Sequence, residues 1–182
     1  MKQKFTLVLI ITAFCFLKTN SLKAQVNTQD SLALVDFYNS TNGPHWGRPD
    51  GWLTKSPVST WYGVRVTASR VTQLSFTLNN INGVIPSSIG NLTGLTSLQI
   101  RINQLKGSIP NSIGYLSNLT EIDFFDNQLT GSLPSSMGNL INLDTLNLLE
   151  NELSGPIPAS FTKLKKMTYL SLDGNGGITG NI

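Results

Sequence analysis

The chain has 182 residues, with 13 basic and 10 acidic side chains and a single cysteine. Such a length fits one domain with short accessories. Four of the basic residues and the cysteine lie in residues 1–24, so the rest of the chain has nine basic and ten acidic residues. That composition excludes a disulfide framework or a cysteine-based metal site outside this first segment. It also gives no support to binding of nucleic acid or anionic membranes.

The first 24 residues have the organisation of a secretory signal peptide. Two early lysines precede an uncharged, mostly apolar run from Phe5 to Leu17, and the small residue Ala24 stands where cleavage would occur. The run is short for a segment that spans a bilayer. We therefore expect residues 1–24 to be removed on export, and the mature chain to be secreted or held at the cell surface without inserting into the membrane. The alternative is an uncleaved N-terminal membrane anchor.

Residues 25–70 do not repeat, and we expect them to form an N-terminal cap. The stretch "QDSLALVDFYNSTNG" has apolar residues at helical spacing, with Asp30 or Ser31 as the N-cap and Asn42 at the stop. A loop-rich stretch follows with three tryptophans: Trp46, Trp52 and Trp61. These side chains supply a large apolar area that can cover the first strand of the next segment. An aromatic ligand site in the cap is the functional alternative.

From residue 71 the sequence repeats every 24 residues without gaps. Complete units begin at residues 71, 95, 119 and 143, and a truncated fifth unit runs from 167 to Ile182. Apolar residues alternate at the fourth and sixth positions, which predicts a short strand with one buried face. The ninth position is always asparagine, which can bond backbone groups left free where the chain turns away. A unit this small cannot bury its own apolar face, so stacked units must share one core in a solenoid.

The repeat pattern LxxLxLxxNxLxGxIPxxIGxL resembles the plant-specific type of leucine-rich repeat over residues 71–182. The cap stretch "STWYGVRV" resembles the cap of the same family, in which plant members carry two cysteines; here Ser59 and Val66 stand in their places, as in secreted Bacteroidetes proteins. The resemblance implies an α/β-type solenoid, a right-handed superhelix after a helical, tryptophan-rich cap. Short parallel strands would line its concave face, and loop and 3-10 segments its convex face.

The fifth unit stops where the other units have proline, and no polar cap follows its last turn. Solenoids need terminal caps for solubility. We therefore expect the chain to be a fragment of a longer protein, with a natural terminus as the alternative.

No catalytic, metal or cofactor site is predicted. His45 is the only histidine, and no nucleophile motif accompanies it. Metal sites use several converging His, Cys or carboxylate ligands, and phosphate sites use a glycine-rich motif; neither pattern occurs. We therefore expect a non-enzymatic protein.

Exposed strand positions should line up into columns across the stacked units. In "TEIDFFDNQLTG", the repeat places Phe124 in the core and Phe125 on the concave face. Phe125 and Leu149 form an apolar pair ringed by charge, which is typical of a recognition patch, although free surface variation is the alternative interpretation. The expected ligand-binding residues are Arg101, Glu121, Asp123, Phe125, Asp126, Asn147, Leu149, Glu150, Tyr169 and Asp173.

These features together predict a secreted or cell-surface binding module for a protein or glycan ligand outside the cytoplasm. Two alternatives stay open. The chain could inhibit an extracellular glycosidase, as members of the family that it resembles do, or it could be the ligand-sensing ectodomain of a larger receptor or adhesin.

Overall fold

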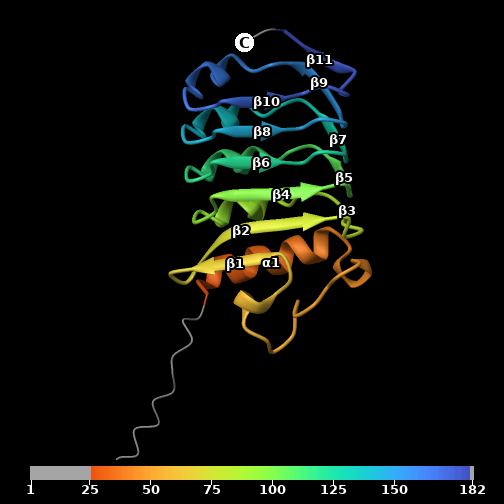
Figure 1. Ribbon diagram of the computed structural model, residues 1–182, viewed down its shortest axis with the longest axis vertical. Helices are drawn as coiled ribbons and strands as arrows, with labels where there is room; N and C mark the ends of the chain where they lie inside the picture. Colours follow the sequence, from red (N-terminus) through yellow and green to blue (C-terminus); the bar gives the residue numbers. More distant parts are fainter. Residues whose placement is uncertain (1–25, 181–182) are drawn as a thin grey trace, which may run out of the picture.

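The structure, a computed structural model, describes residues 26–180, so the expected export segment at residues 1–24 and the end at Ile182 lie outside the described residues. Figure 1 shows an elongated stack in which successive turns of the chain follow one another from the N-terminal helix to the last strands. No helix within residues 26–180 is both long and apolar enough to span a bilayer.

Each repeat turn contributes one strand to a six-stranded sheet, and the cap contributes the remaining strand, β1. Its order along the stack is β1 (Val64–Thr67), β2 (Arg70–Thr77), β4 (Ser97–Arg101), β6 (Glu121–Asp123), β8 (Thr145–Asn147) and β10 (Tyr169–Ser171). Only the β1–β2 pair is antiparallel; the other pairs are parallel. Leu98 pairs with Ile122, which pairs with Leu146, so one unit of the repeat makes one turn of the solenoid. The predicted parallel solenoid is confirmed.

A second, five-stranded sheet runs along the stack beside the first. It contains β3 (Asn82–Gly83), β5 (Gln104–Gly107), β7 (Gln128–Gly131), β9 (Glu152–Pro156) and β11 (Gly177–Thr179). This sheet was not expected from the sequence, because its strands run into the thirteenth-position glycines, such as Gly107 and Gly131, which are typical of turns.

The return segment of each unit is a short 3-10 helix, as predicted. The four helices are η3 (Ser87–Asn91), η4 (Asn111–Tyr115), η5 (Ser135–Asn139) and η6 (Ala159–Lys163). Each begins after a proline with φ between −61° and −73°. Proline fixes this angle and lacks an N–H, so it suits the first position before a helical turn.

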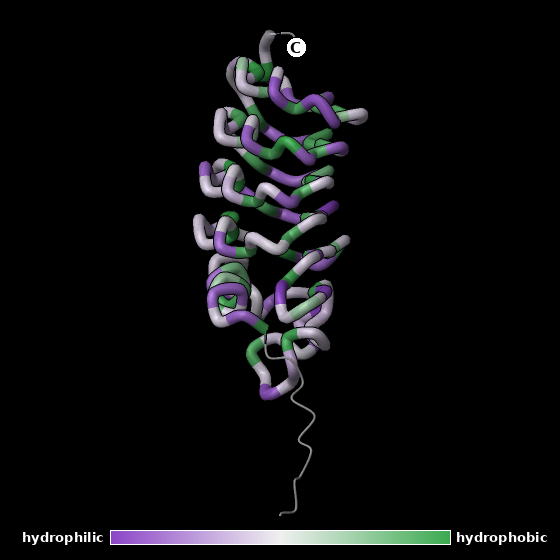
Figure 2. Tube along the Cα trace, turned by 90° about the vertical axis from the view of Figure 1, so that its left-hand side faces the viewer, coloured by the Kyte–Doolittle hydropathy of each residue, from purple (hydrophilic) through white to green (hydrophobic). Residues whose placement is uncertain are grey.

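The core follows the alternation at the fourth and sixth positions of the units. Leu98, Ile100, Ile122 and Phe124 are all 0% exposed, which confirms that Phe124 is a core residue. Full burial of such a side chain stabilises the fold by roughly 1.5–3 kcal/mol. In Figure 2, apolar positions recur in every turn of the stack, between hydrophilic stretches.

The asparagines at the ninth position form a buried ladder. The Asn127 side chain donates from Nδ2 to the carbonyls of Ile100 at 2.7 Å and Phe124 at 3.1 Å. Its Oδ1 accepts from the Leu105 amide at 3.0 Å. One side chain thus joins two neighbouring turns and satisfies backbone groups that a turn away from the strand leaves buried.

The cap begins with α1 (Thr28–Ser40), but its N-cap is Asn27, whose Oδ1 accepts from the Gln29 amide at 2.8 Å. The prediction of Asp30 or Ser31 as the N-cap is wrong, because the Asp30 carboxylate is fully buried against Arg70. The helix ends at the expected place, since Asn42 has the left-handed φ of 59°.

The three tryptophans of the cap are buried beneath α1 and β2. Trp46 and Trp52 pack against Phe76 of β2, with ring centroids 5.3 and 6.0 Å away. Each indole N–H donates to a backbone carbonyl, at 2.9 to 3.1 Å. The aromatic side chains therefore cover the first complete turn of the solenoid, as the structural interpretation predicts.

Candidate binding face

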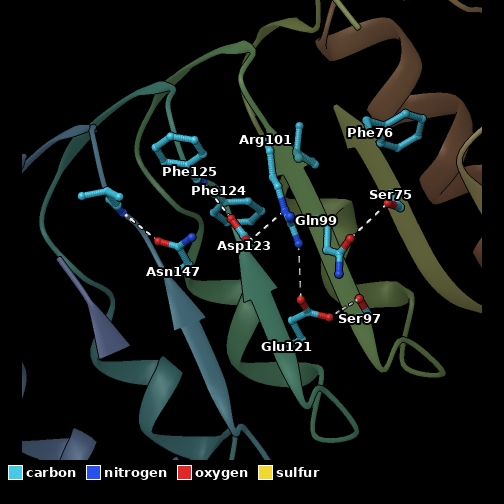
Figure 3. A network of polar contacts seen from close by, with 12 residues as sticks. Ser75, Phe76, Ser97, Gln99, Arg101, Glu121, Asp123, Phe124, Phe125 and Asn147 are labelled. Carbon is cyan, nitrogen blue, oxygen red and sulfur yellow. Dashed lines mark hydrogen bonds and ion pairs between the residues drawn. The ribbon is translucent and has the colours of Figure 1, made fainter. Parts of the chain in front are cut away.

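The strand face is the side of the six-stranded sheet formed by the third, fifth and seventh positions of each unit. Figure 3 shows its middle part, where β4 supplies Arg101, β6 supplies Glu121 and Asp123, and β8 supplies Asn147. These side chains lie on adjacent strands because the repeat places equivalent positions side by side in register.

Arg101 is held by two carboxylates of the next strand. Its Nε lies 2.9 Å from Asp123 Oδ2, and its Nη2 lies 3.7 Å from Glu121 Oε1. The Nε group forms an ion pair but is not aligned for a hydrogen bond, which leaves that N–H without a hydrogen-bond acceptor. Ser97 also donates to Glu121 at 3.0 Å. The sequence-predicted cation of this face is therefore neutralised within the face.

The fifth-position residues Asp123 and Asn147 support the backbone that follows them. Asp123 Oδ1 accepts from the Phe125 amide at 3.1 Å, and Asn147 Oδ1 accepts from the Leu149 amide at 3.2 Å. Asp123 is only 5% exposed, so the expectation that its side chain is solvent-exposed is wrong. Its ion pair with Arg101 across the strands buries it, and a column of single positions cannot reveal such a pair.

The apolar pair occupies the next positions, just past these anchors. Phe125 and Leu149 are both half-buried, and each follows a side chain that bonds its amide. Three acidic side chains are exposed around the end of the strands: Asp126, Glu150 and Asp173. Apolar surface is thus presented at fixed positions beside negative charge.

Two predicted residues lie apart from the network around Arg101. Tyr169 on β10 is 48% exposed, and Asp173 lies beyond the end of that strand. Among the described residues, neither side chain hydrogen bonds or forms an ion pair with the Arg101 network. Within residues 26–180, the predicted set therefore contains one ion-paired group, Arg101 with Glu121 and Asp123, and no other member bonds this group through its side chain.

Sequence reasoning did not include Leu78 and Ile102 among the site residues. Both occupy the eighth position and have a left-handed φ of 52°, and Leu78 is 72% exposed. This conformation costs a non-glycine residue roughly 1–2 kcal/mol. Asp126, Glu150 and Gly174 occupy the same repeat position and also have a left-handed φ. The occurrence of Asp and Gly at this position was the sequence feature that could have indicated the left-handed backbone. Leu78 adds exposed apolar surface at the edge of the strand face.

No metal-binding group is found in the part of the chain that the structure describes. A cluster of three or more His, Cys, Asp or Glu side chains that could hold an ion is absent there.

The strand face can offer apolar contact, hydrogen bonds and negative charge to a partner.

The geometry defines a repeat solenoid that presents a ladder of short parallel strands. Three segments, 70–92, 118–140 and 142–164, match the family model described as Leucine Rich Repeat. No curated protein matches the chain.

Solved structures of plant proteins share the fold. The BIR2 ectodomain of Arabidopsis thaliana has 23% identity and a TM-score of 0.75, covering 86% of this chain and 96% of that chain. The BIR3–SERK2 complex from the same plant has 31% identity and a TM-score of 0.71, covering 83% and 84%. A plant ice-binding protein has 27% identity and a TM-score of 0.75, covering 83% of this chain and 49% of that one. The chain therefore contains leucine-rich repeats and has the solenoid fold of these ectodomains.

Proposed function

We propose that this chain is a non-enzymatic, extracellular binding module whose strand face recognises a protein or peptide partner. The observation that carries the proposal is the pair of half-buried side chains Phe125 and Leu149. The backbone amide of each residue donates a hydrogen bond to the side chain two positions earlier, Asp123 or Asn147. Ordered apolar groups lose little conformational entropy on binding, which favours affinity. Export is supported by the signal-like composition of residues 1–24.

The charge of the strand face limits the class of partner that it can bind. Arg101 is already paired with Glu121 and Asp123, whereas Asp126 and Glu150 are exposed and have no ion-pair partner among the described residues. A partner with an apolar side chain flanked by lysine or arginine fits this arrangement, because charge complementarity steers association and selects partners. A neutral glycan would leave the carboxylates unpaired.

The similar structures are consistent with this proposal. One of them is a complex between BIR3 and SERK2, and another is an ectodomain. We also propose the finer assignments that the repeat and cap motifs imply: the plant-specific type of repeat, a cap of the Bacteroidetes kind, and a concave strand face.

The test uses a displayed library of random peptides selected against the exported chain. Selected peptides should contain basic and apolar residues, and Phe125→Ser should weaken their binding at least about tenfold, or 1.4 kcal/mol. Tyr115→Ser is the matched control, because Tyr115 is an aromatic side chain 69% exposed on η4, away from the strand face. Equal binding by the Phe125 variant and the unmodified chain would count against the strand face.

Two alternatives from the same class of protein make different predictions. An inhibitor should block an extracellular glycosidase, so a panel of such enzymes assayed with and without the chain decides that case. A receptor ectodomain or adhesin requires an anchoring or signalling segment elsewhere in the protein, which the gene sequence would show.

Ice binding is a second candidate function, favoured by a ladder of threonines at the second position. Thr96 Oγ1 donates to the Thr72 carbonyl and Thr120 Oγ1 to the Thr96 carbonyl, both at 2.9 Å. These bonds hold the exposed side chains of Thr96 and Thr120 on adjacent turns, and Asp144 takes the same position in the next unit. Thermal hysteresis that Thr120→Lys abolishes, and Phe125→Ser does not, would favour ice binding over the strand-face proposal.

A further inference from the structure

The cap contains a pocket of about 850 Å³ at the end of the stack opposite β11. Its walls come from the start of α1, from the loop before β1 and from the turn that joins β1 to β2. Figure 1 shows α1 and β1 together at the lower end of the stack. Sites for small molecules are concave and typically enclose roughly 300–1,000 Å³. No strand-face residue lines this pocket, so it is separate from the proposed binding face.

The walls combine apolar groups with hydroxyls and carry no charged side chain. Trp61 and Val66 contribute apolar surface, and the Trp61 indole is fixed because its Nε1 donates to the Ser56 carbonyl at 3.1 Å. Four serines also line the pocket: Ser31, Ser56, Ser59 and Ser69. Within residues 26–180 none of these hydroxyls bonds a protein group, so they are available to a ligand.

The turn at the pocket wall has an unusual backbone. Ala68 and Ser69 join β1 to β2 with left-handed φ angles of 48° and 62°. Two-residue hairpin turns of this kind favour Asn-Gly or Asp-Gly, because most side chains disfavour a positive φ. Here both residues line the pocket. Backbone strain of this sort clusters at ligand sites, where the surrounding structure maintains it.

We propose that this pocket binds a small neutral carbohydrate, the size of a mono- or disaccharide. A serine hydroxyl both donates and accepts, so the four serines match the hydroxyl groups of a sugar. The C–H faces of a sugar ring can pack on the apolar side chains of Pro57, Val58 and Val66, which are less buried than Trp61. A charged ligand would find no opposite charge in the walls. The site does not depend on the proposed function of the strand face.

The test titrates the exported chain with glucose, galactose, N-acetylglucosamine and their disaccharides, followed by saturation-transfer NMR and calorimetry. Ser59→Trp places a bulky ring at an exposed lining position and should weaken binding at least about tenfold. Ser56→Leu should also weaken binding, because it removes a lining hydroxyl, and it keeps the backbone carbonyl that holds Trp61. Ser117→Trp is the matched control, since Ser117 is exposed on another part of the stack.

We expect one of these sugars to bind the chain and the Ser117→Trp variant alike. Circular dichroism melting of each variant shows that it is folded before binding is compared. Failure of every sugar to bind at tens of millimolar overturns the proposal, and so does sugar binding that both pocket variants retain. Toluene serves as an apolar probe, and binding of toluene without any sugar would overturn the assignment to carbohydrate.

Discussion

The carboxylate of Asp30 in the first turn of α1 receives two hydrogen bonds from Arg70 at the start of β2. The Arg70 Nε and Nη2 atoms lie 3.0 and 2.9 Å from the two Asp30 oxygens, and the Val71 amide donates to the same carboxylate at 2.7 Å. Asp30 is fully buried, whereas the Arg70 side chain is 35% exposed. This contact joins the cap to the solenoid across 40 positions of sequence.

Removing the two partners should have unequal costs. Arg70→Leu leaves a buried carboxylate without its counterion and should destabilise the chain by about 3–5 kcal/mol. Asp30→Asn leaves a partly exposed guanidinium that water can solvate, so its cost should be smaller. Urea unfolding followed by circular dichroism measures both, and a larger cost for Asp30→Asn would contradict the account.

The stabilisation that the Asp30–Arg70 ion pair provides should not depend on pH between pH 7 and pH 10. Hydrogen bonding to Asp30 raises the pKa of Arg70, against the opposing effect of burial. A raised pKa means that the stabilisation is complete below the ordinary pKa of arginine and is lost only as the pH rises through the higher folded value. The difference in unfolding free energy between the unmodified chain and Arg70→Leu should therefore not fall between pH 7 and pH 10. A steady fall over that interval would contradict the assignment.

The adjacent phenylalanines should respond very differently to truncation. Phe124→Ala removes a fully buried ring and should cost about 3–5 kcal/mol. Phe125→Ala removes a half-buried ring from the strand face and should cost less than about 1.5 kcal/mol. Denaturant unfolding of the two variants compares them directly. Similar losses would place both rings in the core.

The asparagine ladder should be a major source of stability. Asn127→Ala leaves the Leu105 amide and the Ile100 carbonyl buried without partners, at about 1–3 kcal/mol for each group. Asn139→Ala is the control, because Asn139 is exposed on η5 and its side chain bonds no other described residue. Equal thermal midpoints for the two variants would show that the buried bonds contribute nothing.

The strained leucine at the edge of the strand face offers a stabilising substitution. Leu78 is 72% exposed and left-handed, so its replacement loses little burial and can relieve backbone strain. Leu78→Asn should raise the unfolding free energy by about 0.5–1 kcal/mol, because asparagine tolerates this conformation. Leu78→Val should lower it, since a β-branched side chain tolerates the angle least. A destabilised Leu78→Asn chain would show that Leu78 packs in a way that its exposure does not reveal.

The repeat made much of the fold predictable, since each column of the alignment has one physical role. Alternation predicted that Phe124 lies in the core, and the invariant asparagine predicted the ladder. Contacts between different columns were not predictable in this way. Asp123 is buried by Arg101 of the preceding unit. Asp30 is not the N-cap of the helix and instead forms an ion pair with Arg70, far along the chain. Such pairs depend on the distance between side chains on different turns, and this distance is known only once the chain is folded.

The same limit applies to the candidate site. Exposed columns indicated where a partner could bind, but Leu78 was left out of the expected site because the exposed positions of its unit are otherwise neutral and polar. The cap illustrates the converse. The tryptophans were expected to cover the first strand, and they do, yet the pocket beside Trp61 depends on a turn that composition does not reveal.

The two ends of the described stack differ in how well their apolar side chains are covered. At the cap, Phe37 and the tryptophans close the first turn, and Asp30 ties α1 to β2. At the other end, Leu170 and Ile178 are only half-buried on strands that have a neighbour on one side. Each turn contacts only its neighbours, so local opening spreads turn by turn. In this 182-residue chain, amide hydrogen exchange should therefore be faster around β10 than around β2.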